Sequence, residues 1–155
     1  MSHYKNQEID FINRTKAIIE QYEKFQIAEK QKFEVTLFLN CLVGLLILPQ
    51  QHWFDCLSTE LVSQKEWGIN PNHISSIKDG ETKNVKDIAR HLRNSVAHYE
   101  FTAFDNSSKQ ISRIKFKDKD KSGNLTFEAI IPLPNLRQFT AKLTNTLIME
   151  MNKQK

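Results

Sequence analysis

The spacing of apolar and polar residues predicts helices at both ends of the chain. From about Asn6 to Lys30, apolar side chains recur three and four positions apart, with charged residues between them. This is the period of an amphipathic helix. A shorter helix is predicted from Asp55 to Gln64. A last helix should begin after Pro134 and run toward the C-terminus, with an apolar stripe formed by Leu136, Phe139, Leu143 and Leu147.

The longest apolar run extends from Phe33 to Leu48 and contains Glu34, Thr36 and Asn40. It is shorter than the ~20 apolar residues that a helix needs to span a bilayer. A helix that is apolar on nearly every side is typical of the centre of a helical bundle. We therefore predict a buried central helix, which Pro49 ends.

The segment before the last helix follows the period of a β-strand. From Ile111 to Lys119, Ile114 and Phe116 alternate with basic residues, as expected for a strand with one buried face. A turn and a second apolar run, at 122–131, complete the pattern of a β-hairpin. The predicted fold is therefore mainly α, an up-and-down helical bundle with an inserted β-hairpin (about 111–131) before the C-terminal helix.

Length and composition indicate one domain, spanning residues 1–155. Only 4 glycines and 4 prolines are present, which favours long helices over many short strands. The first residues lack the apolar segment of a signal peptide. Cys41 and Cys56 lie in apolar stretches without the paired spacing of a zinc site, so we expect reduced core thiols. We therefore expect a cytoplasmic protein with no metal and no other cofactor.

The predicted hairpin carries the excess positive charge. Between Lys109 and Lys121 there are six basic and two acidic residues, which accounts for the whole formal net charge of +4. A basic strand face is what a phosphate backbone would bind. The alternative is a solvated face whose lysines prevent edge-to-edge aggregation. The candidate nucleic-acid-binding residues on this face are Arg113, Lys115, Lys117 and Lys119.

The strongest chemical signal lies near the end of a predicted helix that starts near Lys83. Arg93, Asn94 and His98 fall on neighbouring turns. An arginine fork binds phosphate through two hydrogen bonds, and a histidine transfers protons near neutral pH. These are the two tasks of metal-free RNA cleavage, in which a 2′-hydroxyl attacks its neighbouring phosphate. His91 and Ser95 share another face of the helix and are secondary candidates.

The same residues also fit a purely structural role. An arginine at a helix surface commonly serves an interface, and a histidine near a helix C-terminus is favoured by the helix dipole. Spacing alone leaves both interpretations open.

The segment IARHLRNSVAHYEF (88–101) resembles the signature of the HEPN superfamily, whose ribonucleases carry Arg-polar-x-x-x-His near the end of a bundle helix. With the apolar helix VTLFLNCLVGLLILP (35–49), it is similar to a small single-domain HEPN family of bacterial and plasmid proteins. Arg93, Asn94 and His98 match the motif without substitution. The resemblance implies a bundle of four to five helices that dimerises, with two motifs facing each other in one composite RNase site.

The resemblance also implies partners and regulation. Many relatives act as toxins or in defence against phage, so a cognate antitoxin or defence partner is expected. Relatives that are silenced by nucleotidylation typically carry a tyrosine two residues after the histidine. Here Tyr99 follows His98 directly and Glu100 takes the next place, so that form of control is not expected.

Two functions therefore stand as hypotheses. The first is a metal-independent endoribonuclease that acts as a homodimer on RNA, with His98 as general base or acid, Arg93 stabilising phosphate charge and Asn94 positioning the reacting group. The second is a non-catalytic helical dimer that binds RNA or a partner protein, with Arg93 and His98 as interface hydrogen-bonding groups.

Overall fold

The computed structural model describes residues 6–25, 33–47, 52–64, 66–108 and 110–153. Its long helices are α1 (Gln7–Lys24), α2 (Glu34–Leu42), α4 (Val85–Ala97) and α5 (Leu133–Lys153). A π-helical turn, η2 (Val43–Ile47), continues α2, and two short 3₁₀ turns follow, η3 (Phe54–Cys56) and η4 (Pro71–His73).

The strands form one four-stranded antiparallel sheet. In chain order they are β1 (Ile74–Ile77), β2 (Phe101–Asp105), β3 (Ile111–Lys119) and β4 (Leu125–Pro132), and their order across the sheet is β1-β4-β3-β2. The predicted hairpin is present as β3 and β4. The predicted fold class is nevertheless wrong, because the hairpin is the centre of a substantial sheet and not an insertion into a helical bundle.

The sheet is completed by two strands that lack a clear sequence pattern. β1 has the sequence ISSI and β2 the sequence FTAFD, and neither is long enough to establish an alternation. Each strand of a hairpin leaves one edge of backbone N–H and C=O groups without partners. β1 pairs with β4, and β2 pairs with β3, so both edges of the hairpin are satisfied within the chain.

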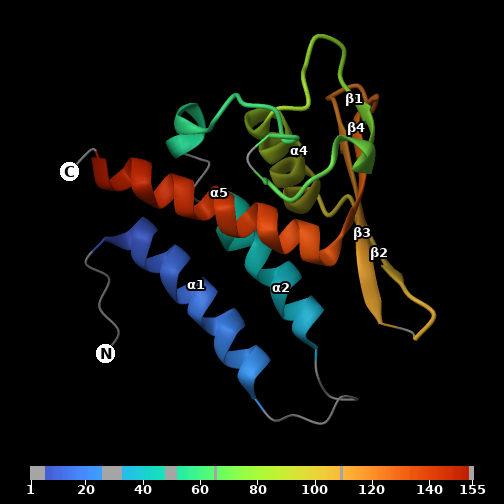
Figure 1. The fold of residues 1–155 in the computed structure, drawn as a ribbon. Coiled ribbons are helices and arrows are strands. Elements are labelled where there is room, and N and C mark those ends of the chain that lie inside the picture. Colours follow the sequence, from blue (N-terminus) through green and yellow to red (C-terminus); the bar gives the residue numbers. More distant parts are fainter. Residues whose placement is uncertain (1–5, 26–32, 48–51, 65, 109, 154–155) are drawn as a thin grey trace.

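The helices form two layers on one side of the sheet (Figure 1). α4 and the start of α5 lie against the sheet, and α1 and α2 lie on the other side of α5. The sheet contributes five fully buried side chains to the core: Ile114, Phe116, Phe127, Ala129 and Ile131. The predicted stripe of α5 is confirmed, since Leu136, Phe139, Leu143 and Leu147 are all 0% exposed.

The two N-terminal helices agree in part with the sequence prediction. The Asn6 side chain caps α1 by accepting a hydrogen bond from the Ile9 N–H at 3.2 Å. The predicted extension of this helix beyond Phe25, to Lys30, lies outside the described residues, as does the predicted stop at Pro49. α2 is buried on one side only, because Thr36 and Asn40 remain exposed.

The helix predicted from Asp55 to Gln64 is wrong beyond the short turn η3. The backbone carbonyl oxygens of Ser58 and Glu60 accept hydrogen bonds from the N–H groups of Lys86 and Val85, at 3.0 and 2.9 Å. The first N–H groups of a helix have no partner within it. This segment therefore stays non-helical because its carbonyl groups bond the start of α4. Within the described residues, no helix is long and apolar enough to cross a membrane.

Candidate functional site

Helix α4 carries the motif and is fixed at its start by a side-chain cap. The Asn84 side chain accepts a hydrogen bond from the Asp87 N–H at 2.7 Å and donates to the Asp87 carboxylate at 2.7 Å. Residues three and four apart then bury one face of the helix against the sheet and η2. This buried face consists of Val85, Ile88, Ala89, His91, Leu92, Ser95 and Val96.

The C-terminus of α4 places the predicted histidine at the surface. His98 is the C-cap and is exposed. The backbone N–H of Glu100 bonds the Ser95 carbonyl at 2.8 Å, and the N–H of Tyr99 bonds the Val96 carbonyl at 3.2 Å. These two bonds form a Schellman ending, which satisfies the last carbonyl groups of the helix.

The three predicted catalytic residues line one surface hollow. Arg93 and Asn94 are half-buried, and His98 is exposed at the same hollow. Ile47 and Ala97 complete its wall. Among the described residues, none forms a hydrogen bond or an ion pair with the His98 imidazole. The hollow therefore brings together a guanidinium and an imidazole that is open to a ligand.

Asn94 connects Arg93 to the sheet. The Asn94 Oδ1 accepts hydrogen bonds from Arg93 Nη2 at 2.8 Å and Nε at 3.2 Å. The Asn94 Nδ2 donates to Asp118 Oδ2 at 3.0 Å. Because both ends of the amide are used, Asn94 orients the guanidinium. Among the described residues no carboxylate pairs with Arg93, so its remaining N–H donors stay available to an anion.

Asp118 and Glu81 hold the buried imidazole of His91 from both sides. The His91 Nδ1 lies 2.7 Å from Asp118 Oδ2, and its Nε2 lies 2.6 Å from Glu81 Oε2. The ring also stacks on Phe127, with centroids 4.7 Å apart and planes 3° apart. A doubly protonated ring satisfies this arrangement by donating to both carboxylates. His91 thereby ties the loop before α4 to strand β3.

The two secondary candidates therefore do not reach the hollow. His91 is 2% exposed and Ser95 is 0% exposed. The Ser95 hydroxyl donates to the His91 carbonyl at 2.7 Å, within its own helix. The structure places both in the contact between α4 and the sheet, where they support the fold around the motif.

Sequence reasoning missed Asp118 and Glu81. The alternation that identified Ile114 and Phe116 as inward-facing also places Asp118 on the buried face, two residues further on. A carboxylate at such a position requires a partner, so this signal was present in the sequence. Glu81 has no comparable signal, because it lies in a loop before α4.

The Glu81 carboxylate makes stability depend on pH. Burial raises the pKa of Glu81. Hydrogen bonds from His91 and Arg90 lower the pKa by more than burial raises it, so the pKa of Glu81 lies below its usual 4.5. A lowered folded-state pKa stabilises the protein above the unfolded-state value, and this contribution is lost as pH falls through the folded-state pKa.

We therefore expect Glu81→Gln to lower the unfolding free energy at neutral pH, with a difference from wild type that shrinks below pH 4.5. Urea unfolding of both proteins across this pH range measures the effect. A difference that stays constant over the whole range would contradict it.

The basic residues of β3 lie on the sheet face that points away from α4. Glu128 of β4 pairs with Lys115 at 2.9 Å and with Lys117 at 3.8 Å, and Lys119 pairs with Glu100 at 2.7 Å. The carboxylates offset part of the charge that the sequence assigned to this face. The face stays basic because two carboxylates meet four cations, which are Arg113, Lys115, Lys117 and Lys119.

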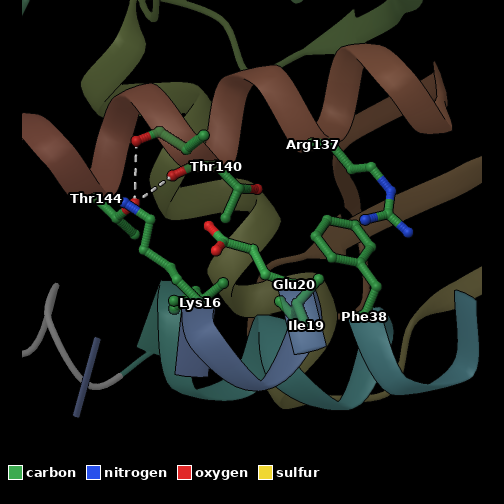
Figure 2. A pocket seen from close by; sticks show the side chains of 9 residues that line it. Lys16, Ile19, Glu20, Phe38, Arg137, Thr140 and Thr144 are labelled. Atoms are coloured by element: carbon green, nitrogen blue, oxygen red, sulfur yellow. Dashed lines mark hydrogen bonds between the residues drawn. The ribbon is translucent and has the colours of Figure 1, made fainter. Parts of the chain in front are cut away.

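A second hollow lies between α1, α2 and α5 (Figure 2). Most of its polar groups are already engaged: Lys16 Nζ donates to Asn145 Oδ1 at 2.6 Å, and the Arg137 guanidinium lies 4.5 Å from the Phe38 ring centroid. The Thr140 and Thr144 hydroxyls donate to carbonyl groups of their own helix. None of the lining residues comes from α4 or the sheet, so this hollow is separate from the motif.

Within the described part of the chain, no group of His, Cys, Asp and Glu side chains is arranged to hold a metal ion.

Comparison with known proteins identifies the family. The search of curated proteins and the search of solved structures gave no significant match. The family model described as HEPN pEK499 p136 matches residues 1–154. The chain therefore belongs to the HEPN pEK499 p136 family.

Proposed function

We propose that this protein is a metal-independent endoribonuclease that acts as a homodimer. The observation that carries the proposal is the hollow shared by Arg93 and His98, in a chain of the HEPN family. One group can bind a phosphate and the other can transfer a proton. Family membership is consistent with a role in RNA cleavage or nucleotide binding.

In the proposed reaction, RNA supplies its own nucleophile. A His98 imidazole removes the proton of a 2′-hydroxyl, and the 2′-oxygen attacks the adjacent phosphorus. The bond from phosphorus to the 5′-oxygen breaks, and that oxygen receives a proton from a second imidazole. The products are a 2′,3′-cyclic phosphate and a 5′-hydroxyl. General acid–base catalysis of this kind contributes about 10²–10⁴-fold to the rate.

Arg93 stabilises the negative charge that develops on the phosphate oxygens. A donor that is already oriented toward this charge costs little reorganisation during the reaction. The hydrogen bonds from Arg93 to Asn94, and from Asn94 to Asp118, supply that orientation. In this proposal Asn94 and Asp118 are positioning residues.

A second copy of the chain supplies the second imidazole. Apolar side chains adjoin the motif at the surface, because Ile47 and Ala97 line the hollow itself. Burial of such side chains favours association. A two-fold axis close to His98 places both imidazoles at one composite site. The proposed roles as a toxin or phage-defence effector, with an antitoxin or defence partner, rest on the family resemblance alone.

We expect the outer face of the sheet to contribute to RNA binding. Reversing two charges, with Lys115→Glu and Lys117→Glu, should weaken binding of single-stranded RNA. It should also flatten the salt dependence of the binding constant by roughly 0.7 for each lost phosphate contact. Fluorescence anisotropy over a series of salt concentrations measures both quantities.

The matched control reverses two charges elsewhere, with Lys24→Glu and Lys153→Glu at the ends of α1 and α5. Equal affinity and equal salt dependence for the Lys115/Lys117 variant and wild type would show that this face is a solvated surface that does not bind RNA.

The nuclease proposal is tested with purified protein, single-stranded RNA and EDTA. Wild type should cut the RNA, whereas Arg93→Ala and His98→Ala should cut it far more slowly. Sedimentation of the wild type should show a dimer. A wild type that leaves RNA intact, or variants that cut equally well, would contradict the proposal and favour a non-catalytic dimer.

A further inference from the structure

Tyr99 occupies a backbone position that suits glycine. Its φ is +58°, in the left-handed region that is unfavourable for residues with a Cβ. It follows the C-cap His98 in the Schellman ending, at the position where glycine is most common. The fold would therefore form at least as easily with glycine here. A strained residue that the fold does not require points to a function for its side chain.

The Tyr99 ring is almost entirely outside the core. It is 81% exposed, more than any other large apolar side chain among the described residues. Its aromatic contact is with Phe101, with ring centroids 4.9 Å apart and planes 62° apart. An edge contact of this kind restrains the ring without covering both faces. An aromatic face remains available for stacking.

The ring borders a hollow that also contains two lysines. Tyr99 lines it together with Lys115 and Lys117 of β3, beside Glu100, Phe101 and Thr102. Phe101 pairs with Phe116 across the strands and packs against the core, so the exposed ring here is that of Tyr99. The two lysines share one carboxylate, that of Glu128, at 2.9 and 3.8 Å. The carboxylate of Glu100 is paired with Lys119. The charge left over at this hollow is therefore positive.

An aromatic face beside a positive charge matches the two parts of a nucleotide. A base stacks on the ring, and this contact is tolerant of sequence because every base has a π-face. A phosphate pairs with a lysine ammonium. An extended single strand presents both groups together, whereas a paired strand has its bases stacked inside the duplex.

We propose that Tyr99, Lys115 and Lys117 form a subsite for one nucleotide of single-stranded RNA, adjacent to the motif. This inference rests on the proposed function, because it takes the same RNA as ligand. The subsite follows His98 directly in the chain, so it holds a nucleotide close to the bond that is cut. Tyr99 supplies the stacking surface, and the lysines attract the phosphate.

The test is binding of a fluorescently labelled single-stranded RNA whose 2′-hydroxyl groups are all methylated, so that it cannot be cut through that oxygen. Tyr99→Gly should bind about tenfold more weakly than wild type, the loss expected for one stacked base. Tyr99→Phe keeps the ring and should bind like wild type. Met149→Ala, which removes an exposed side chain of α5, is the matched control and should have no effect.

Thermal unfolding separates a binding defect from a folding defect. Tyr99→Gly should unfold at the wild-type temperature or above it, because glycine suits the left-handed backbone. Ultraviolet crosslinking of RNA that contains 5-iodouridine should attach the RNA to Tyr99, as mapped by peptide mass spectrometry. Weaker binding by a fully folded variant, together with this crosslink, supports the subsite.

Three results would overturn the subsite. They are wild-type affinity in Tyr99→Gly, absence of RNA binding by wild type, or a Tyr99→Gly variant that loses the dimer and not the RNA. The last result would assign the ring to contact with a second copy. RNA binding that depends on Tyr99 without any cleavage would contradict the nuclease function and leave the subsite standing. Cleavage with the same kcat/KM in wild type and Tyr99→Gly would contradict the subsite and leave the nuclease function standing.

Discussion

Replacing Asp118 by alanine is expected to lower the free energy of unfolding by about 3–5 kcal/mol, the cost of removing one partner from a buried charged pair. The Asp118 side chain is 8% exposed and accepts hydrogen bonds from both His91 and Asn94. Without it, the His91 Nδ1 loses its carboxylate partner, while Nε2 keeps Glu81, and the Asn94 amide loses its contact with the sheet. Urea unfolding at neutral pH, followed by circular dichroism, measures the change.

The matched control is Asp105→Ala, at the exposed end of β2. A surface change of this kind usually alters stability by less than about 0.5 kcal/mol. Asp118→Asn keeps the shape and one carbonyl acceptor but removes the charge, so it should fall between wild type and Asp118→Ala. Equal stability of Asp118→Ala and Asp105→Ala would show that the contacts of Asp118 contribute little.

Replacing His98 by alanine is expected to reduce the rate of RNA cleavage by about 10²–10⁴-fold, the range for loss of a general acid or base. Its stability should change little, because the side chain is exposed and lies at the end of α4. A time course of RNA cleavage with EDTA present measures the rate, and urea unfolding measures the stability.

His52→Ala is the matched control, because it removes a histidine whose side chain is 73% exposed and which pairs with Glu8 of α1. Its cleavage rate should equal that of wild type. Arg93→Lys gives a second comparison: it keeps the positive charge but loses the fork that Asn94 orients, so activity should fall without full loss. Wild-type activity in His98→Ala would contradict the catalytic role.

The sheet could be predicted from the sequence only in its central part. β3 and β4 were predictable because nine and eight residues alternate around a tight turn. β1 and β2 have only four and five residues. β1 precedes α4 and β2 follows it. Each pairs with the hairpin only because the tertiary fold brings it to one edge of that hairpin. The error in fold class follows from these two strands alone.

The segment after η3 illustrates the same limit. Its residues are compatible with a helix, yet the carbonyl groups of Ser58 and Glu60 bond the first N–H groups of α4. An extended conformation delivers these carbonyls to a neighbouring element, whereas a helix would use them internally. The periodicity of one segment cannot show that its carbonyl groups accept hydrogen bonds from another segment.

The candidate site divides in the same way. Arg93, Asn94 and His98 were identified from their chemistry and spacing, and they line one hollow. The sequence could not distinguish which polar residues of α4 face the hollow and which face the sheet. His91 and Ser95 share a face with each other, and that face is buried. The role of Asn94 as a link between Arg93 and Asp118 also required coordinates from two elements.

The sheet therefore has two roles in this account. Its inner face supplies Asp118, which orients Arg93 through Asn94. Its outer face supplies the lysines that we propose to bind RNA. A HEPN chain in which β3 supports the motif with one face and binds substrate with the other would couple recognition to catalysis over a short distance.

The most direct measurement is cleavage, with EDTA present, of an RNA in which the 2′-hydroxyl at a mapped cutting position has been replaced by hydrogen. We expect wild type to leave this position intact, to cut the unmodified RNA there, and to produce a 2′,3′-cyclic phosphate end. Because the nucleophile is the 2′-oxygen, no other change in the RNA is needed to prevent cutting. Cleavage at the 2′-deoxy position, or failure to cut the unmodified RNA, would contradict the account.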